Sequence, residues 1–329
     1  MNKVLELVCP AGTPAALRGA IDAGADTVYL GFRDETNARN FPGLNFDRDE
    51  LREGIEYAHS KNREIFVAIN TFPRTGNPEP WQKAVDDAAS LGADAVILAD
   101  IGLLQYCQET HPNLRRHLSV QASASNPDAI NFFHREFDVR RVVLPRVLTV
   151  AEIAALNSVI AVETEVFAFG GLCVMAEGRC SLSSYATGQS PNLCGVCSPA
   201  SHVRYEETDL GLKSRLGNFT INMFDEDEAV GYPTLCKGRF IANGKTSYLF
   251  EEPTSLNAMD ILPELIDAGV VALKIEGRQR GKAYVERVVS GFRQAVDAVA
   301  NGEAAPQIDL EGLTEGQRNT AGAYDKGWR

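Results

Sequence analysis

Short apolar runs rich in β-branched residues alternate with helical stretches along most of the sequence, and this alternation constrains the fold more than any other feature. Eight such runs predict β-strands. They lie near Val4–Cys9, Thr27–Phe32, Glu64–Asn70, Ala95–Asp100, Leu118–Ser123, Arg141–Arg146, Glu163–Phe169 and Val271–Glu276. The intervening stretches predict helices near Pro14–Ala23, Arg48–Ser60, Trp81–Leu91, Ile101–Thr110, Asp128–Phe137, Ala151–Asn157 and Asn257–Asp267, with a last one near Tyr284–Ala300. Strands that alternate with helices indicate a parallel sheet.

Two of the predicted joints between a helix and the next strand share one pattern. Gly24-Ala25-Asp26 precedes the second strand, and Gly92-Ala93-Asp94 precedes the fourth. A glycine at the end of a helix can adopt a left-handed conformation that turns the chain sharply into the next strand. The shared joint therefore supports a repeated helix–strand unit.

The spacing of the predicted strands favours a closed barrel. Successive strands start 22 to 37 residues apart up to the seventh, and the eighth starts 108 residues later. An insertion of about 80 residues thus interrupts the period, and the other roughly 250 residues have the usual size of a closed (β/α)8 barrel. We therefore expect a TIM-like α/β barrel at residues 1–172 and 256–302, a cysteine-containing insertion at 173–255 after strand 7, and a C-terminal tail at 303–329. An open, doubly wound sheet is the alternative.

Polar side chains follow several of the predicted strands at their carboxyl ends, where barrels of this kind form their active sites. They are Cys9, Arg33, Asn70, Asp100, Gln121, Arg146 and the run Lys274-Ile275-Glu276-Gly277-Arg278. Because side chains alternate along a strand, we expect Lys274 and Glu276 to face the barrel axis. Each of these residues could also have a structural role, and Lys274 and Glu276 could neutralise each other.

Five of the seven cysteines fall in the predicted insertion: Cys173, Cys180, Cys194, Cys197 and Cys236. Cysteines that cluster in a reducing compartment are more often metal ligands than packing residues. Structural zinc usually takes paired Cys-x-x-Cys motifs, and only Cys194 and Cys197 form such a pair. Six residues lie between Cys173 and Cys180, sixteen between Cys180 and Cys197, and thirty-eight between Cys197 and Cys236. Such irregular spacing also suits an iron–sulfur cluster. Spacing alone leaves zinc and the cluster equally open.

The charge of the chain limits its partners. Lys and Arg number 32 against 44 Asp and Glu, which gives a net charge of −12. Such a chain has no global attraction to nucleic-acid phosphates or anionic lipid, although it leaves room for a local basic groove. The sparse, odd number of cysteines argues against an extracellular disulfide framework. With neither a signal-peptide core nor a run of about eighteen apolar residues, the sequence predicts a cytoplasmic protein that does not cross a membrane.

Motifs along the chain carry a family resemblance. They are Cys9-Pro10-Ala11-Gly12, Thr36-Asn37-Ala38-Arg39-Asn40-Phe41, Ala68-Ile69-Asn70-Thr71-Phe72, Ser119-Val120-Gln121-Ala122-Ser123, Val143-Leu144-Pro145-Arg146, Glu177-Gly178-Arg179-Cys180, Cys197-Ser198-Pro199-Ala200, Tyr232-Pro233-Thr234-Leu235-Cys236-Lys237-Gly238-Arg239 and Lys274-Ile275-Glu276-Gly277-Arg278. With them the chain resembles the collagenase-like peptidase family, which includes iron–sulfur hydroxylation enzymes. Within that family it is similar to the proteins of oxygen-independent ubiquinone biosynthesis.

This resemblance implies a cofactor, an activity and partners. The cofactor is a [4Fe-4S] cluster held by Cys173, Cys180, Cys197 and Cys236. Cys194 departs from the family pattern, so it is either a bystander or replaces Cys197 as a ligand. The implied activity is oxygen-independent hydroxylation of the aromatic ring of quinone precursors, with prephenate as the oxygen donor. The implied partners are a UbiV-like homologous subunit, which completes a heterodimer, and a UbiT-like lipid carrier.

The resemblance also implies a substrate site at the strand ends, without identifying a catalytic residue. Its candidate residues are Arg39, Asn70, Gln121, Arg146, Lys274, Glu276 and Arg278. The four cations of this set would hold an anionic donor by charge-assisted hydrogen bonds.

Three other functions stay open. Prephenate-dependent hydroxylation of tRNA or rRNA bases is implied by other members of the family, and the acidity of this chain argues against it. Peptidase activity is the historical label of the family, yet the sequence contains no His-Glu-x-x-His zinc motif and no Gly-x-Ser-x-Gly nucleophile motif. In the third alternative, the chain is not itself catalytic and stabilises its UbiV-like partner or delivers electrons to it.

Overall fold

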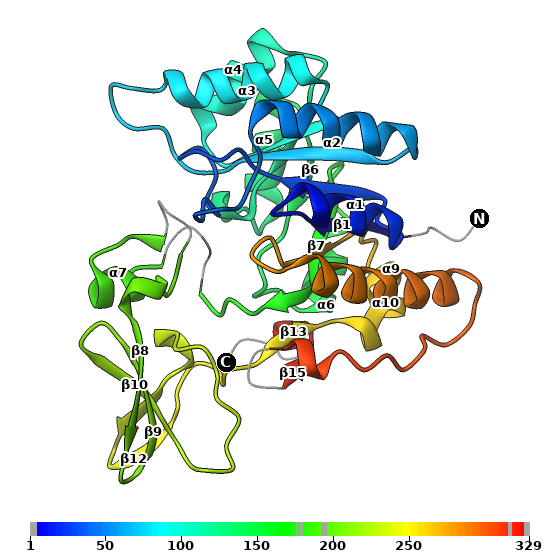
Figure 1. Cartoon of the computed structure of the whole chain (residues 1–329). Helices are drawn as coiled ribbons and strands as arrows, with labels where there is room; N and C mark the ends of the chain where they lie inside the picture. Colours follow the sequence, from blue (N-terminus) through cyan, green and yellow to red (C-terminus); the bar gives the residue numbers. More distant parts are fainter. Residues whose placement is uncertain (1–4, 176, 178–179, 192–195, 315–317, 326–329) are drawn as a thin grey trace.

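The computed structural model describes residues 5–175, 177, 180–191, 196–314 and 318–325. Eight parallel strands form a closed barrel, in the order β1 to β7 followed by β14, which pairs with both β7 and β1 (Figure 1). They are β1 (Glu6–Pro10), β2 (Thr27–Leu30), β3 (Glu64–Ile69), β4 (Ala95–Leu98), β5 (Arg115–Leu118), β6 (Val139–Val143), β7 (Glu163–Gly171) and β14 (Ala272–Ile275). The predicted (β/α)8 barrel is confirmed, and the open sheet is wrong.

Helices connect the strands and surround the barrel. They are α1 (Pro14–Asp22), α2 (Arg48–Ser60), α3 (Glu79–Leu91), α4 (Ile101–Thr110), α5 (Pro127–Phe137), α6 (Val150–Asn157), α9 (Leu262–Asp267) and α10 (Lys282–Ala300). Asp47 and Thr149 each form a capping box, which fixes where α2 and α6 begin. Gly24 and Gly92 turn the chain into β2 and β4 with φ values of 106° and 89°, as the shared joint predicts. No helix in the described part of the chain is long and apolar enough to cross a membrane.

Apolar and charged side chains fill the inside of the barrel. Val8, Tyr29, Phe66, Ala68, Ala95, Ile97 and Ala272 form an inner apolar cluster, separate from the larger core between the strands and the helices. Lys274 extends to this inner cluster, with its Nζ 3.8 Å from the centre of the Tyr29 ring. Its neighbours Leu273 and Ile275 belong to the outer core. The predicted alternation along this strand is therefore confirmed.

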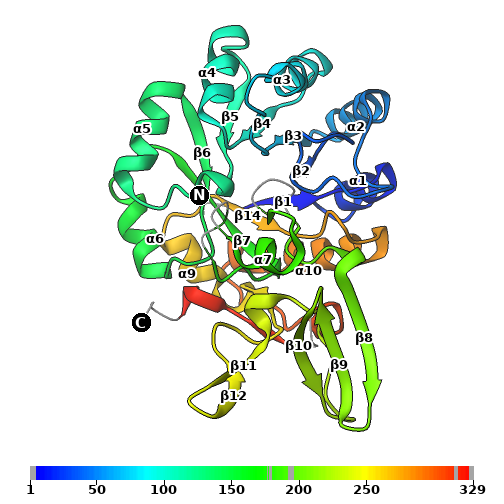
Figure 2. The same cartoon turned by 90° about the vertical axis from the view of Figure 1, so that its left-hand side faces the viewer.

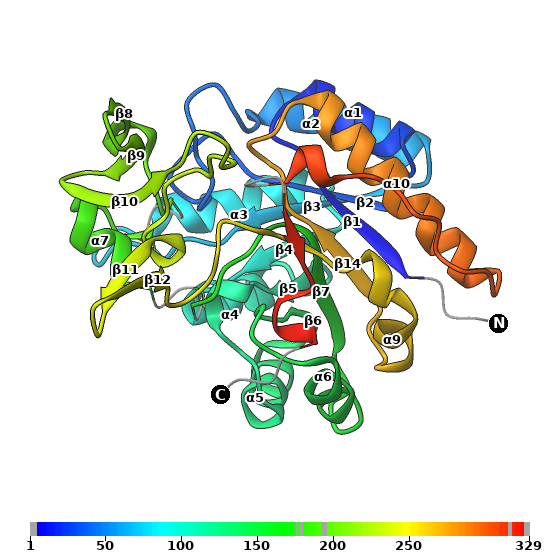
Figure 3. The ribbon, with the colours of Figure 1, turned by 90° about the horizontal axis from the view of Figure 1, so that it is seen from below.

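The chain between β7 and α9 forms an insertion beside the barrel. It contains α7 (Leu182–Thr187), an antiparallel sheet of β8 (Val203–Thr208), β9 (Gly211–Leu216) and β10 (Phe219–Phe224), and a hairpin of β11 (Arg239–Ala242) and β12 (Lys245–Tyr248). Figure 2 looks onto one end of the barrel and shows α7 in front of it, and Figure 3 shows β8 to β12 to one side. The insertion returns through β13 (Ser255–Asn257), which is antiparallel to β7 and parallel to β15 (Asn319–Thr320).

Two predicted elements differ most from the observed ones in their bounds. The predicted strand Leu118–Ser123 ends at its first residue, because Ser119 accepts the Gln121 N–H and the chain turns into a 3-10 helix, Val120–Ala122. The predicted helix Asn257–Asp267 begins only at Leu262, since residues 255–257 pair with the end of β7 as β13. In both places a contact at the end of a barrel strand changes the bounds of the element, and the local sequence pattern does not indicate that contact.

Candidate functional site

Four cysteines that the sequence singles out come together where the insertion leaves the barrel. Cys173 lies two residues beyond β7, Cys180 and Cys197 lie on either side of α7, and Cys236 lies in a 3-10 turn, Leu235–Lys237. The pKa of Cys197 is raised to about 11 and that of Cys236 to about 12, mainly by burial, and negative charge on Cys173 and Cys180 contributes to both rises. Such mutual effects indicate that the four thiols lie in one region of the structure.

The four candidate ligands are all thiols. Among the described residues, no three His, Cys, Asp or Glu side chains are placed to hold one metal ion. A structural zinc ion needs four donors around one point. Four thiols are the ligand set of a [4Fe-4S] cluster. The chemistry of these donors therefore fits such a cluster, and it also fits a structural zinc ion.

The other cysteines do not join this group in the described structure. Cys194 lies outside the described residues, so its role as a bystander or as a replacement for Cys197 stays a prediction. Cys9 and Cys107 are fully buried in the outer core of the barrel, which matches a packing role.

A chain of ion pairs lies beside the thiols. Arg39, in the loop after β2, contacts Glu276 Oε1 at 3.3 Å, and Glu276 Oε2 pairs with Arg146, which follows β6. Arg146 also pairs with Glu177 of the insertion. Burial raises the pKa of Cys197 and the Arg39 guanidinium opposes this rise, which indicates that the chain of ion pairs lies near this thiol. Burial alone raises the pKa of Glu276, but Arg146 and Arg39 outweigh it and lower the pKa.

Arg278 is a buried cation whose hydrogen-bond partner is neutral. Its side chain is 7% exposed, and its Nη1 donates to Asn37 Oδ1 at 2.6 Å. No carboxylate among the described residues forms an ion pair with it. Burial lowers the pKa of Arg278 to about 10. A buried guanidinium without a paired carboxylate is suited to bind an anion.

Lys274 is paired deeper inside the barrel. Its Nζ lies 2.6 Å from Glu165 Oε1, and Arg141 contacts the other oxygen of Glu165 at 3.4 Å. Lys274 and Glu276 therefore do not neutralise each other, and that expectation is wrong. The two residues face different partners because Lys274 lies within β14 whereas Glu276 follows its end.

Asn70 and Gln121 have different roles at the strand ends. Asn70 Oδ1 accepts the Ala38 N–H at 3.1 Å, so Asn70 holds the loop that carries Arg39. Gln121 is 9% exposed, and its Oε1 has no hydrogen-bond partner among the described residues. Glu177 Oε2 and Arg146 Nε are also buried without a partner there. Buried polar atoms of this kind are rare and suit a bound molecule.

Two glycines allow the backbone to approach closely at this site. A Cβ on Gly12 would lie 1.9 Å from the carbonyl oxygen of Arg278. A Cβ on Gly170, which has φ +116°, would lie 2.8 Å from the carbonyl oxygen of Glu276. The loop after β14 therefore fits against β1 and β7 only because both positions lack a side chain.

Sequence reasoning missed three residues of this site. Glu177 and Asn37 lie in the quoted motifs Glu-Gly-Arg-Cys and Thr-Asn-Ala-Arg-Asn-Phe, so their motifs already marked them. Glu165 lies in the predicted seventh strand, where alternation from an inward residue would have placed it inside the barrel. The sequence signal for these three residues is weak, because a carboxylate or amide in a motif does not show which residue it contacts.

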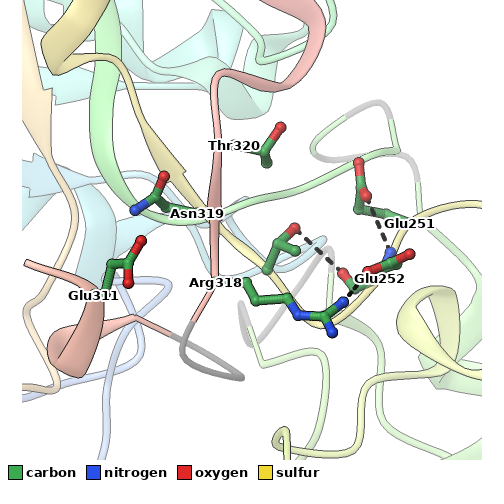
Figure 4. Close-up of a pocket in the computed structure, with 7 residues that line it drawn as sticks. Glu251, Glu252, Glu311, Arg318, Asn319 and Thr320 are labelled. Carbon is green, nitrogen blue, oxygen red and sulfur yellow. Dashed lines mark hydrogen bonds and ion pairs between the residues drawn. The ribbon is translucent and has the colours of Figure 1, made fainter. Parts of the chain in front are cut away.

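A cavity of about 390 Å³ lies elsewhere (Figure 4). It is lined by Glu251, Glu252, Thr254, Glu311, Arg318, Asn319 and Thr320. Arg318 pairs with Glu252 at 2.7 Å. Three of the lining side chains are carboxylates, which disfavours an anionic ligand. None of the predicted site residues lines this cavity, so we place the candidate site at the thiols and the ion-pair chain.

Known proteins are similar to this sequence over nearly its whole length. An uncharacterized protease of Methanocaldococcus jannaschii is 32% identical over 314 residues, which cover 94% of this chain and 69% of that protein. The tRNA hydroxylation protein P1 of Bacillus subtilis is 30% identical over 334 residues, covering 99% and 72%. The 23S rRNA 5-hydroxycytidine C2501 synthase of Escherichia coli is 30% identical over 299 residues, covering 90% and 40%. The model of peptidase family U32 matches residues 12–328, and the chain therefore belongs to this family of collagenase-like proteins.

Proposed function

We propose that this chain is part of an enzyme that hydroxylates an unsaturated ring without molecular oxygen and that it carries a [4Fe-4S] cluster on Cys173, Cys180, Cys197 and Cys236. The observation that carries the proposal is the position of four thiols from four segments beside a buried chain of Arg and Glu. Relatives named as tRNA and rRNA hydroxylation proteins support the reaction class. A bound cluster supplies one-electron transfer at this position.

The cations of the site are suited to hold an anionic oxygen donor such as prephenate, which carries two carboxylates. Arg278 offers a guanidinium that no described carboxylate pairs with. Arg39 adds positive charge near Arg278 and Cys197, since it affects the pKa of both. Gln121 Oε1 is an acceptor for a hydroxyl or N–H group of the bound molecules. Lys274 acts indirectly in this arrangement, since it is already bound to Glu165.

RNA bases are the substrate class that the relatives support. Two of the relatives described above are named for hydroxylation of tRNA and of a 23S rRNA cytidine. Gln121 also suits this class, because a carboxamide pairs with the polar edge of a base.

Quinone precursors are the second candidate, and the charge of the chain favours them. A net charge of −12 opposes the non-specific attraction that most RNA-binding proteins use. On this reading the chain acts like the UbiU-type proteins that its motifs resemble. It forms a heterodimer with a UbiV-like subunit, and a UbiT-like carrier presents the apolar precursor in the cytoplasm.

The cluster is tested by anaerobic purification followed by iron, zinc and acid-labile sulfide determination. We expect iron and sulfide in equal amounts, and Cys173→Ala to abolish both. Stoichiometric zinc without sulfide would overturn the proposed cofactor.

The substrate class is tested by deleting the gene and growing the strain without oxygen. Mass spectrometry of hydrolysed RNA and of extracted quinones then reports both candidates in one culture. Loss of a hydroxylated nucleoside supports RNA, and loss of ubiquinone supports the quinone precursor. If both products persist at wild-type levels, the proposed hydroxylation is wrong.

A further inference from the structure

Asn37 is the neutral partner that holds the buried Arg278 guanidinium. Its side chain is 2% exposed, and its Oδ1 accepts two hydrogen bonds, from Arg278 Nη1 at 2.6 Å and from the Arg39 N–H at 3.0 Å. Its Nδ2 donates to the Phe32 carbonyl oxygen at 3.2 Å. A carboxamide makes all three contacts, whereas a carboxylate has no hydrogen to donate to Phe32 and an alanine side chain makes none of them.

This amide joins two loops at the carboxyl end of the barrel. Asn37 lies in the loop after β2, and Arg278 lies in the loop after β14, 241 residues further along the sequence. Both are closely packed. A Cβ on Gly31 would lie 2.4 Å from Asn37 Cγ, and a Cβ on Gly12 would lie 1.9 Å from the Arg278 carbonyl oxygen. The packing therefore holds the amide and the guanidinium in one arrangement.

The charges of the site leave the Arg278 guanidinium uncompensated. Both oxygens of Glu276 are paired, one with Arg39 and the other with Arg146, and Glu177 also pairs with Arg146. Three guanidinium groups thus face two carboxylates in the described part of the site. The third guanidinium contacts an amide where a carboxylate of the same shape would neutralise it.

We propose that Asn37 is a positioning residue, which orients the Arg278 guanidinium toward a carboxylate of the oxygen donor and leaves its positive charge available to that ligand. The inference rests on the proposed function, because the ligand is the anionic donor of that reaction. A guanidinium binds a carboxylate through two parallel hydrogen bonds, which require a fixed orientation. The amide engages only Nη1, so it does not occupy the rest of this planar group.

Two substitutions separate the orientation of Arg278 from its charge. Asn37→Ala removes the three hydrogen bonds and leaves the charge, whereas Asn37→Asp keeps an acceptor for Arg278 and adds a negative charge. The matched control is Asn40→Asp, which adds the same charge at an exposed position of the same loop. Iron content and thermal unfolding are measured first for each protein. The dissociation constant for prephenate is then measured by calorimetry on the anaerobically purified, cluster-loaded protein.

We expect Asn37→Asp to raise the dissociation constant at least about tenfold, because its carboxylate competes with the ligand for Arg278, and Asn37→Ala to raise it about threefold. Asn40→Asp is expected to stay within about twofold of the wild type, because water and salt screen its charge. The stabilities should follow the reverse order, with Asn37→Ala less stable than Asn37→Asp, because the alanine leaves the buried guanidinium without a partner. Binding that weakens in the order of lost stability would show a purely structural role and overturn the inference.

A double variant tests the same inference if Asn37→Asp does not fold. In an Arg278→Gln protein, Asn37→Ala is expected to cause no further rise in the dissociation constant, since a residue that acts through Arg278 then has nothing to orient. An additive rise, or a folded Asn37→Asp protein that binds prephenate as tightly as the wild type, would overturn the inference and leave the proposed function intact. A wild-type protein that binds no prephenate would overturn the proposed donor itself, and the inference with it.

Discussion

Arg278 is expected to favour binding of an anion while adding little to the stability of the fold. Its charge is buried against a neutral amide, so folding gains little from it. We expect Arg278→Gln to leave the thermal unfolding midpoint unchanged or to raise it. We also expect the dissociation constant for prephenate, measured by calorimetry on the cluster-loaded protein, to rise at least about tenfold, since a hydrogen bond to a charged group contributes about 1.5–3 kcal/mol. Lys282→Gln, which changes an exposed lysine at the start of α10, is the control.

His117 makes a separate prediction about pH. It is fully buried inside the barrel, packs edge-on against Phe66 at 4.6 Å, and has no partner for either ring nitrogen among the described residues. Burial lowers its pKa well below the usual value, and Arg141, Arg115 and Lys274 lower it further. The unfolded chain therefore binds a proton on this imidazole at a pH where the folded protein does not. Stability from this residue is present above about pH 6.5 and is lost as the pH falls below it.

Urea unfolding of the wild type and of His117→Leu at pH 7.5, 6.5 and 5.5 measures this effect. Between pH 6.5 and 5.5 we expect the wild type to lose up to about 1.4 kcal/mol more than the variant, which is the limit for one proton per pH unit. Parallel loss in the two proteins over that interval would show that His117 is not the source.

At the scale of elements, the end of β7 connects the barrel to the first thiol. Gly170 has φ +116° there, and a Cβ would lie 2.8 Å from the Cβ and the carbonyl oxygen of Glu276. Gly188, at the end of α7, also has a positive φ, but a Cβ added there would have no other atom within 4 Å. Both substitutions to Ala cost backbone strain, of order 1–3 kcal/mol. We expect Gly170→Ala to cost about 1–3 kcal/mol more because it also displaces Glu276.

Unfolding in urea and iron determination on the same preparations compare the two alanine variants. Gly170→Ala is expected to lose iron as well, since Cys173 lies three residues further along, whereas Gly188→Ala keeps it. Equal unfolding free energies for the two variants would contradict the proposed close packing at the end of β7.

Elements were predictable from this sequence to the extent that local patterning determines them. The helical stretch Arg48–Ser60 predicts α2 with its observed bounds, and alternation along the strand places Lys274 inside the barrel. The predicted end of β5 was wrong because Ser119 turns the chain through its own hydroxyl group. The partners of charged side chains are harder to predict than the elements. Nothing in the local sequence indicates that Lys274 pairs with Glu165, 109 residues away in the sequence. Contacts of that kind are set by how strands register in the closed barrel.

At the scale of the whole molecule, the barrel and the insertion differ in how much apolar surface supports them. Every residue of β2, β4 and β14 is buried, whereas β8, β11 and β12 contain no buried residue. The barrel therefore has its own core, while the insertion has less buried apolar surface, so the proposed cluster would contribute more to the stability of the insertion than to that of the barrel. Ligands drawn from separate segments lower the free energy of the folded insertion when a metal group joins them.

Removal of the cluster is accordingly expected to loosen the insertion and not the barrel. Limited trypsin digestion of the loaded and the iron-depleted protein, with the cut sites read by mass spectrometry, tests this. We expect faster cleavage at Arg204, Lys213 and Arg215 in the depleted protein, because local opening exposes segments with few buried contacts. Cys236→Ser should reproduce that pattern, and the thermal unfolding midpoint of the barrel should stay within about 2 °C of the loaded protein, as a local change in stability predicts. Cleavage that accelerates equally between α1 and α6 would show that the cluster supports the whole chain, so that the barrel does not fold independently of it.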